Sequence, residues 1–175
     1  MLQRDYLAAV TSSGGVAGAT AFLPTGASLA TAGLDLAGFM SASSLYVLAL
    51  GQLHGVRVDD LERRRMLVMA SLLGDAGSKV MLEKVAPRVG AHWGKIAAEA
   101  IPMAAIQQVN KVLGPRFVTR YGTRQGVLVL GKQLPLGFGA AIGASGNAAF
   151  GYGVVKAARQ AFGRFPPTWD HLDQN

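Results

Sequence analysis

Three arginines recur at every fourth position, at Arg116, Arg120 and Arg124. On a helix this spacing places three guanidinium groups along one stripe, and Phe117 and Tyr121 lie next to it. A basic stripe bordered by aromatic rings suits an anionic membrane surface or the cytoplasmic face of a membrane protein. A solvated helix face and a phosphate backbone are the alternatives. Because no recognition helix or base-stacking motif accompanies the stripe, we do not expect nucleic acid as the partner.

Asp35 is the only charged residue between positions 6 and 56. Two interpretations are open. The carboxylate lies in a first helical turn or on the surface, where the helix dipole favours it, or it is buried and paired with an arginine of the basic half of the chain.

Two glycine-rich segments resemble nucleotide-binding loops in spacing only. Residues 126–132 fit GxxxxGK, but Gln133 stands where a Mg²⁺-binding Ser or Thr is required, and the intervening residues are large and apolar. Residues 137–143 differ by one position from GxGxxG and follow no strand. We therefore expect no nucleotide cofactor.

Catalytic and metal-binding signatures are weak. Ser145 is not within a GxSxG elbow, and His54, His92 and His171 are far apart, without the spacing of metal ligands. The chain has no cysteine, which removes thiolate catalysis and thiolate metal sites. The sequence favours a protein that is not an enzyme, with no metal and no cofactor.

Composition and periodicity predict an all-α protein. Of the 175 residues, 50% are hydrophobic, 15% are charged and 23 are glycine, and the segments between glycines and prolines have helical periodicity. We expect a single Gly/Ala-rich bundle of six to eight helices over residues 1–164 and a polar tail over 165–175. The predicted helices are about 3–22, 28–54, 60–73, 75–86, 92–113, 115–131 and 139–163.

Local signals refine these helices. Asp59 followed by Glu62 predicts a capping box at the start of 60–73. Pro115 predicts the first turn of a new helix, and Pro102 predicts a kink or break within 92–113.

The last helix carries a seam of mostly small residues, which predicts close helix–helix contact. Its members are Gly139, Gly143, Gly146, Phe150, Gly153 and Ala157. Insertion between lipids and self-association through the same seam are the alternatives.

Segment 36–53 is the most apolar, and on a helix its large and its small or polar side chains separate onto two arcs. The large ones are Leu36, Phe39, Met40, Tyr46, Val47, Leu50 and Leu53, and the others are Ala37, Ser41, Ser44 and Gln52. This pattern predicts a packed bundle helix rather than a helix exposed to lipid on all sides. No cleaved signal peptide is expected, because the apolar run from Leu7 to Val10 is too short.

The net charge of +7 is regional: between Glu99 and Asp170 there are eight basic residues and no acidic one. Several short motifs then line up in order: 22–26, 33–36, 53–56, 59–64 and, near the end, 134–148. Together they resemble the bacterial EcsC-like family. The matching residues treated as structural are Pro24, Asp35, Pro135, Gly139, Gly143 and Asn147.

The resemblance implies a bacterial helical protein of unknown function, named for a component encoded beside an ABC exporter and suspected of membrane association. It carries over no catalytic residue. We expect a non-enzymatic accessory or scaffold protein in the cytoplasm, at the inner face of the membrane, whose partner is an anionic membrane surface or a membrane protein. The alternatives are a soluble homo-oligomer and a helical bundle that binds a lipid or small molecule.

Overall fold

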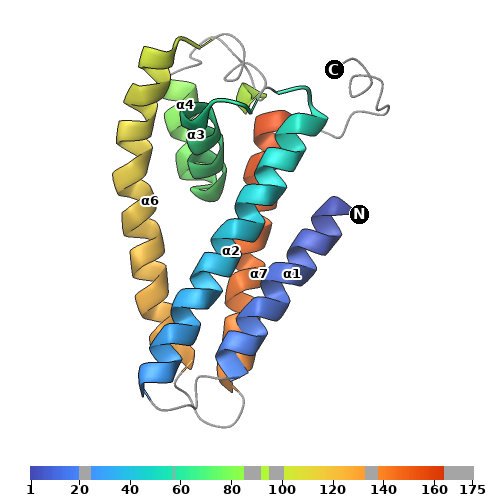
Figure 1. The fold of residues 1–175 in the computed structure, drawn as a ribbon, viewed down its shortest axis with the longest axis vertical. Coiled ribbons are helices and arrows are strands. Elements are labelled where there is room, and N and C mark those ends of the chain that lie inside the picture. Colours follow the sequence, from blue (N-terminus) through green and yellow to red (C-terminus); the bar gives the residue numbers. More distant parts are fainter. Residues whose placement is uncertain (20–24, 57, 85–91, 95–100, 133–137, 164–175) are drawn as a thin grey trace. The chain divides into compact units, whose positions relative to one another are not determined.

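A computed structural model describes residues 1–19, 25–56, 58–84, 92–94, 101–132 and 138–163. In these segments the secondary structure is helical, without a strand, so the all-α prediction is confirmed (Figure 1). The six helices with described bounds are α1 (Leu2–Ala19), α2 (Thr25–Leu53), α3 (Leu61–Leu72), α4 (Asp75–Lys84), α6 (Met103–Lys132) and α7 (Phe138–Phe162). The predicted tail over 165–175 lies outside the described residues.

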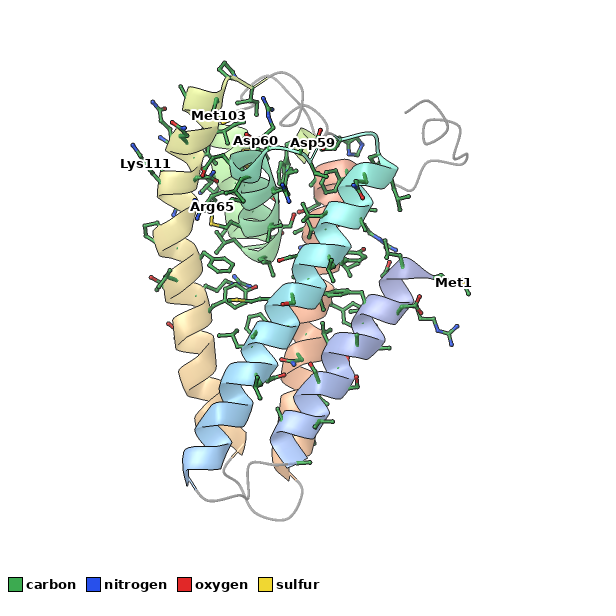
Figure 2. The ribbon with its side chains drawn as sticks, viewed as in Figure 1. Met1, Asp59, Asp60, Arg65, Met103 and Lys111 are labelled. Atoms are coloured by element: carbon green, nitrogen blue, oxygen red, sulfur yellow. The ribbon has the colours of Figure 1, made fainter. Side chains whose placement is uncertain are left out.

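Helix α3 begins one residue later than the predicted capping box requires. Asp60, not Asp59, is the N-cap: its backbone is extended, and its side-chain Oδ1 accepts a hydrogen bond of 2.9 Å from the amide of Arg63. Glu62 therefore lies in the first turn of α3, and its carboxylate contacts Arg65 and Asn110. Figure 2 shows Asp59 and Asp60 where α3 begins.

Helix α6 confirms one proline prediction and corrects the other. The carbonyl of Pro102 accepts hydrogen bonds from the amides of Ala105 and Ile106 just ahead of α6, so of the two predicted outcomes at Pro102 the break, and not the kink, is observed. Pro115 lies inside the helix, which continues through it over 30 residues. A proline at such a position costs about 3 kcal/mol. Buried Leu113 and a glycine immediately before the proline allow the helix to continue.

The chain forms two compact units. The first comprises Met1–Ser44 and Thr119–Gly153, and the second comprises Leu45–Val118 and Val154–Asn175. Helices α2, α6 and α7 contribute residues to both, and α1 belongs to the first unit and α3 and α4 to the second.

In the first unit, α1 packs closely against α7. A Cβ added at Gly14 would meet the carbonyl oxygen of Gly143 and the side chain of Asn147, and one added at Gly151 would lie 3.0 Å from Val10. The contact face therefore follows Gly143, Asn147 and Gly151. The predicted seam agrees with this contact face at Gly143. Toward the C-terminal end of α7 the two differ, because a Cβ at Gly153, the predicted seam residue, would meet nothing within 4 Å.

In the second unit, α3 and α4 form a tight helical hairpin. Gly74, with φ of +65°, connects them in a conformation that favours glycine. A Cβ at Gly77 would collide with the backbone of Ala70, so the two helices cross at van der Waals distance. The largest fully buried side chains of the second unit are Val47, Leu50, Met66, Leu67, Leu73, Met81, Trp93, Ile106, Leu113 and Phe162.

Helix α2 has the two faces that the sequence predicts. Phe39, Tyr46, Val47 and Leu50 are buried, whereas Ala37, Ser41 and Gln52 are exposed. Within the described residues, one helical stretch, Gly33–Leu53, is long and apolar enough to cross a membrane, and the core helix of a soluble protein has the same properties.

Candidate functional site

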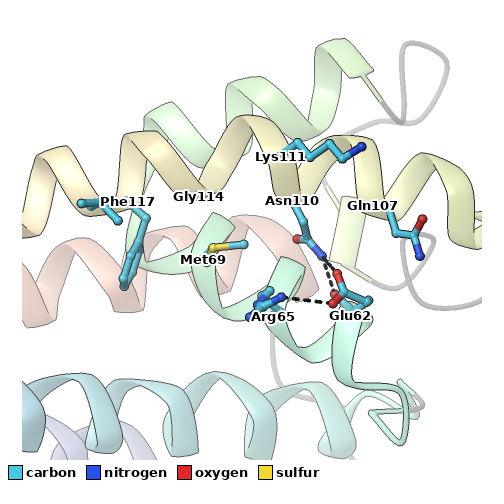
Figure 3. Close-up of a pocket in the computed structure, with 9 residues that line it drawn as sticks. Glu62, Arg65, Met69, Gln107, Asn110, Lys111, Gly114 and Phe117 are labelled. Carbon is cyan, nitrogen blue, oxygen red and sulfur yellow. Dashed lines mark hydrogen bonds and ion pairs between the residues drawn. The ribbon is translucent and has the colours of Figure 1, made fainter.

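The second unit has a concave surface between α3 and α6, which we call the α3–α6 groove. It has a volume of about 690 Å³ and opens to solvent (Figure 3). It is lined by Glu62, Arg65, Met69, Gln107, Asn110, Lys111, Gly114, Phe117 and Val118. Its volume falls in the range of about 300–1,000 Å³ that is typical of small-molecule sites.

The α3 wall follows from the N-cap at Asp60. Because α3 begins at Leu61, Glu62 and Arg65 lie one turn apart, and Arg65 Nη1 is 3.1 Å from Glu62 Oε1. The Arg65 side chain is 57% exposed, so the ion pair is worth less than about 1 kcal/mol. The guanidinium is therefore available to a ligand through its other N–H groups.

The α6 wall contributes an amide that holds the two helices together. Asn110 Nδ2 donates to Glu62 Oε2 at 2.7 Å and to the Glu62 backbone carbonyl at 3.0 Å. The residue is only 9% exposed. Its other side-chain atom, Oδ1, is buried and has no hydrogen-bond partner among the described residues. A buried acceptor without a donor costs about 1–3 kcal/mol.

Gly114 and Pro115 shape the middle of the groove. A residue that carries a Cβ is disfavoured in helical conformation before a proline, which accounts for glycine at 114. A Cβ there would meet nothing within 4 Å, so its absence leaves open space in the groove. Pro115 has no N–H, and the carbonyl of Lys111 consequently lacks the amide that normally bonds it in a helix.

Polar and apolar side chains separate along the groove. Figure 3 shows Gln107 and Lys111 toward one end of the α6 wall, Phe117 toward the other, and Asn110 between them pointing to Glu62. No serine, threonine, cysteine or histidine is among the described residues that line the groove. The groove thus presents charged, amide and apolar side chains.

The predicted arginine stripe is described in part. Arg116, in the second unit, and Arg120, in the first, are exposed on α6. The Arg120 guanidinium carbon lies 5.6 Å from the centroid of the Phe150 ring, a cation–π geometry within the first unit. Arg124 lies in α6, but its side chain is outside the described residues.

The aromatic residues beside the stripe do not border it as predicted. Tyr121 is 2% exposed and its ring packs against Phe39, with centroids 6.2 Å apart, so it belongs to the core of the first unit. Phe117 is half-buried and lines the α3–α6 groove.

Asp35 lies in a buried polar cluster of the first unit. It is 7% exposed and ten residues beyond the start of α2, so the interpretation as a first-turn or exposed residue is wrong. Its Oδ1 accepts hydrogen bonds from Asn147 Nδ2 at 2.8 Å and from Ser13 Oγ at 3.4 Å. An amide and a hydroxyl, both neutral, thus solvate the carboxyl group, and the cluster joins α1, α2 and α7.

The remaining predicted residues lie as follows. Gly139 and Gly143 are in α7, and Gly143 is buried. Pro24 and Pro135 fall outside the described residues. Ser145 is exposed within α7, where no nucleophile elbow can form.

Residues 126–132 are helical in α6 and not a phosphate-binding loop. His54 donates from Nδ1 to the carbonyl of Leu50 at 2.8 Å, and its ring stacks on Phe162. This histidine therefore has the capping and core role that its isolated position suggests.

Sequence reasoning did not single out the groove residues Gln107, Asn110 and Gly114. One signal could have indicated Asn110, because an amide at this position falls among Ile106, Val109 and Leu113 on an apolar helix face. A buried amide needs hydrogen-bond partners. Because the sequence assigned Glu62 to a capping box, its pairing with Asn110 was not predicted.

Comparisons of the chain with protein-family models, with curated proteins and with solved structures found no match. The EcsC-like resemblance therefore stays a prediction from the motifs in the sequence.

Proposed function

We propose that the protein is a non-enzymatic membrane-associated accessory or scaffold protein that attaches peripherally to an anionic lipid surface through α6. The observation that carries this proposal is the exposure of Arg116 and Arg120 one helical turn apart on α6. Each arginine near an anionic membrane contributes about 1 kcal/mol to attachment.

The distribution of charge supports the same proposal. The region 100–169 has eight bases and no acid, so no carboxylate of this region opposes attraction to a negative surface. Val118, which is 70% exposed between the two arginines along the chain, adds an apolar side chain suited to the lipid interface. The EcsC-like resemblance, with its suspected membrane association, agrees with this function.

Sedimentation with vesicles tests the proposal. We expect the protein to pellet at low salt with phosphatidylcholine vesicles that contain phosphatidylglycerol, and not with phosphatidylcholine alone. Binding should weaken as ionic strength rises, because salt screens the exposed charges. Arg116→Glu and Arg120→Glu should each reduce the bound fraction, with partition coefficients about tenfold lower.

Lys79→Glu is the matched control. Lys79 is 76% exposed on α4, and its reversal changes the net charge by the same amount. Unchanged binding of this variant would support attachment through α6. Absence of binding to anionic vesicles at low salt, or an equal loss with Lys79→Glu, would overturn the proposal.

A further inference from the structure

We propose that the α3–α6 groove binds a single-chain anionic amphiphile, of the class of a monoacylglycerol phosphate. The groove includes neither Arg116 nor Arg120, although it shares Val118 with the proposed attachment surface, and the inference does not rest on attachment of the protein to membranes. Two features of the groove define this ligand: its cations and an apolar end.

The cations select a negative head group. Glu62, Arg65 and Lys111 line the groove, and their formal charges sum to one positive charge. Arg65 uses one N–H on Glu62, and the remaining guanidinium donors suit phosphate oxygens. Lys111 is exposed on α6 and its side chain extends toward the end where Gln107 lies, so it adds a second positive charge to this end of the groove.

The apolar end selects a chain. Met69 and Phe117 line the groove on the side away from Gln107 in Figure 3, and Val118, which follows Phe117 on α6, also lines it. Gln107 and Val118 are eleven residues apart on one helix, which corresponds to about 16 Å. A single extended chain fits along an open groove of this length and of 690 Å³.

Isothermal titration calorimetry below the micelle concentration tests the inference. The probe is lauroyl glycerol phosphate, and we expect saturable binding at one site per chain. Two relatives of the probe report on its parts: glycerol phosphate lacks the chain and monolauroylglycerol lacks the charge. Each should bind about tenfold more weakly or worse, because each loses one of the two contacts.

Two pairs of variants place the ligand in the groove. Val118→Glu should weaken binding of the probe about tenfold, whereas Val16→Glu, at an exposed valine of α1, should leave it unchanged. Lys111→Gln should weaken binding of lauroyl glycerol phosphate but not of monolauroylglycerol. Lys79→Gln should affect neither. Circular dichroism of each variant verifies that it is folded.

The inference is overturned if the probe does not bind below its micelle concentration, or if folded Val118→Glu binds it as tightly as the unaltered protein. Arg116→Glu should still bind the probe while its binding to vesicles is reduced. If the unaltered protein binds the soluble probe but does not bind anionic vesicles, the proposed function alone is refuted.

Discussion

The side-chain amide of Asn147 on α7 donates a hydrogen bond of 2.8 Å to Oδ1 of Asp35 on α2, and both residues are buried. The two residues are 112 positions apart in the chain. A buried carboxyl group is costly unless donors replace its water, so this bond couples the placement of α2 to that of α7 within the first unit.

Asn147→Ala removes the donor and leaves the buried Asp35 oxygen without this bond. We expect the free energy of unfolding to fall by about 2–3 kcal/mol, measured by urea denaturation. Ser12→Ala, at an exposed position of α1, is the control and should change it by less than about 0.5 kcal/mol. Equal urea midpoints for the two variants would show that the bond contributes little to folding.

Gly14→Ala and Gly15→Ala should have opposite effects, although the substitutions are identical and adjacent. A Cβ at Gly14 lies 2.6 Å from Asn147 Nδ2 and also meets the Gly143 carbonyl, so α1 must move away from α7, at a cost of about 1–3 kcal/mol. At Gly15 the nearest atom is Ala144 Cβ at 3.8 Å, an ordinary contact.

Gly15→Ala should therefore stabilise α1 by up to about 1 kcal/mol through helix propensity. Thermal unfolding of the two variants provides the comparison. A higher midpoint for Gly14→Ala than for the unaltered protein would contradict the close approach of α1 and α7.

Asp60→Ala tests the observed start of α3. It removes the acceptor of the Arg63 amide and should destabilise the protein by about 1 kcal/mol. Asp59→Ala leaves that acceptor in place and should cost less. If Asp59→Ala were the more destabilising substitution in urea, the result would contradict the N-cap at Asp60 and support the capping box predicted from the sequence.

The raised pKa of the Tyr46 phenol leads us to expect a loss of stability at alkaline pH. Burial raises the pKa of its phenol above the ordinary value of 10.0, and the charge of Arg159 opposes the shift in part. In the interval between the unfolded and the folded pKa, the unfolded chain has lost this proton while the folded protein retains it. The stabilising contribution is therefore complete below pH 10.0 and is lost as pH rises through the folded pKa.

Tyr46→Phe should reduce the decline in urea midpoint above pH 10.0, because phenylalanine keeps the buried ring and has no proton to lose. Measurements at pH 7 provide the reference for each protein. A decline equally steep in Tyr46→Phe would assign the alkaline effect to other groups.

Much of the helical pattern could be predicted because it depends on neighbouring residues. The buried face of α2, with Phe39, Val47 and Leu50, follows from apolar residues spaced at helical periodicity. The prediction failed at Pro115, where local chemistry favours a new helix. Burial of Leu113 and the small residue at Gly114 offset the local cost, and one helix continues.

Less of the candidate site could be predicted. The arginines at 116 and 120 are exposed as their spacing indicates, because periodicity alone sets which residues share a stripe. The prediction that Tyr121 borders this stripe was wrong, because its ring packs against that of Phe39, which is far away in the chain.

By itself the sequence determined that this protein is helical, which face of α2 is buried, and where basic residues gather, since all three depend on residue type and spacing within one segment. Only the tertiary structure decided that Asp35 meets Asn147 and that Asn110 meets Glu62 beside an open groove. These contacts join residues 112 and 48 positions apart. Periodicity reveals which side of a helix faces inward, but the particular residue that it faces depends on how distant helices pack.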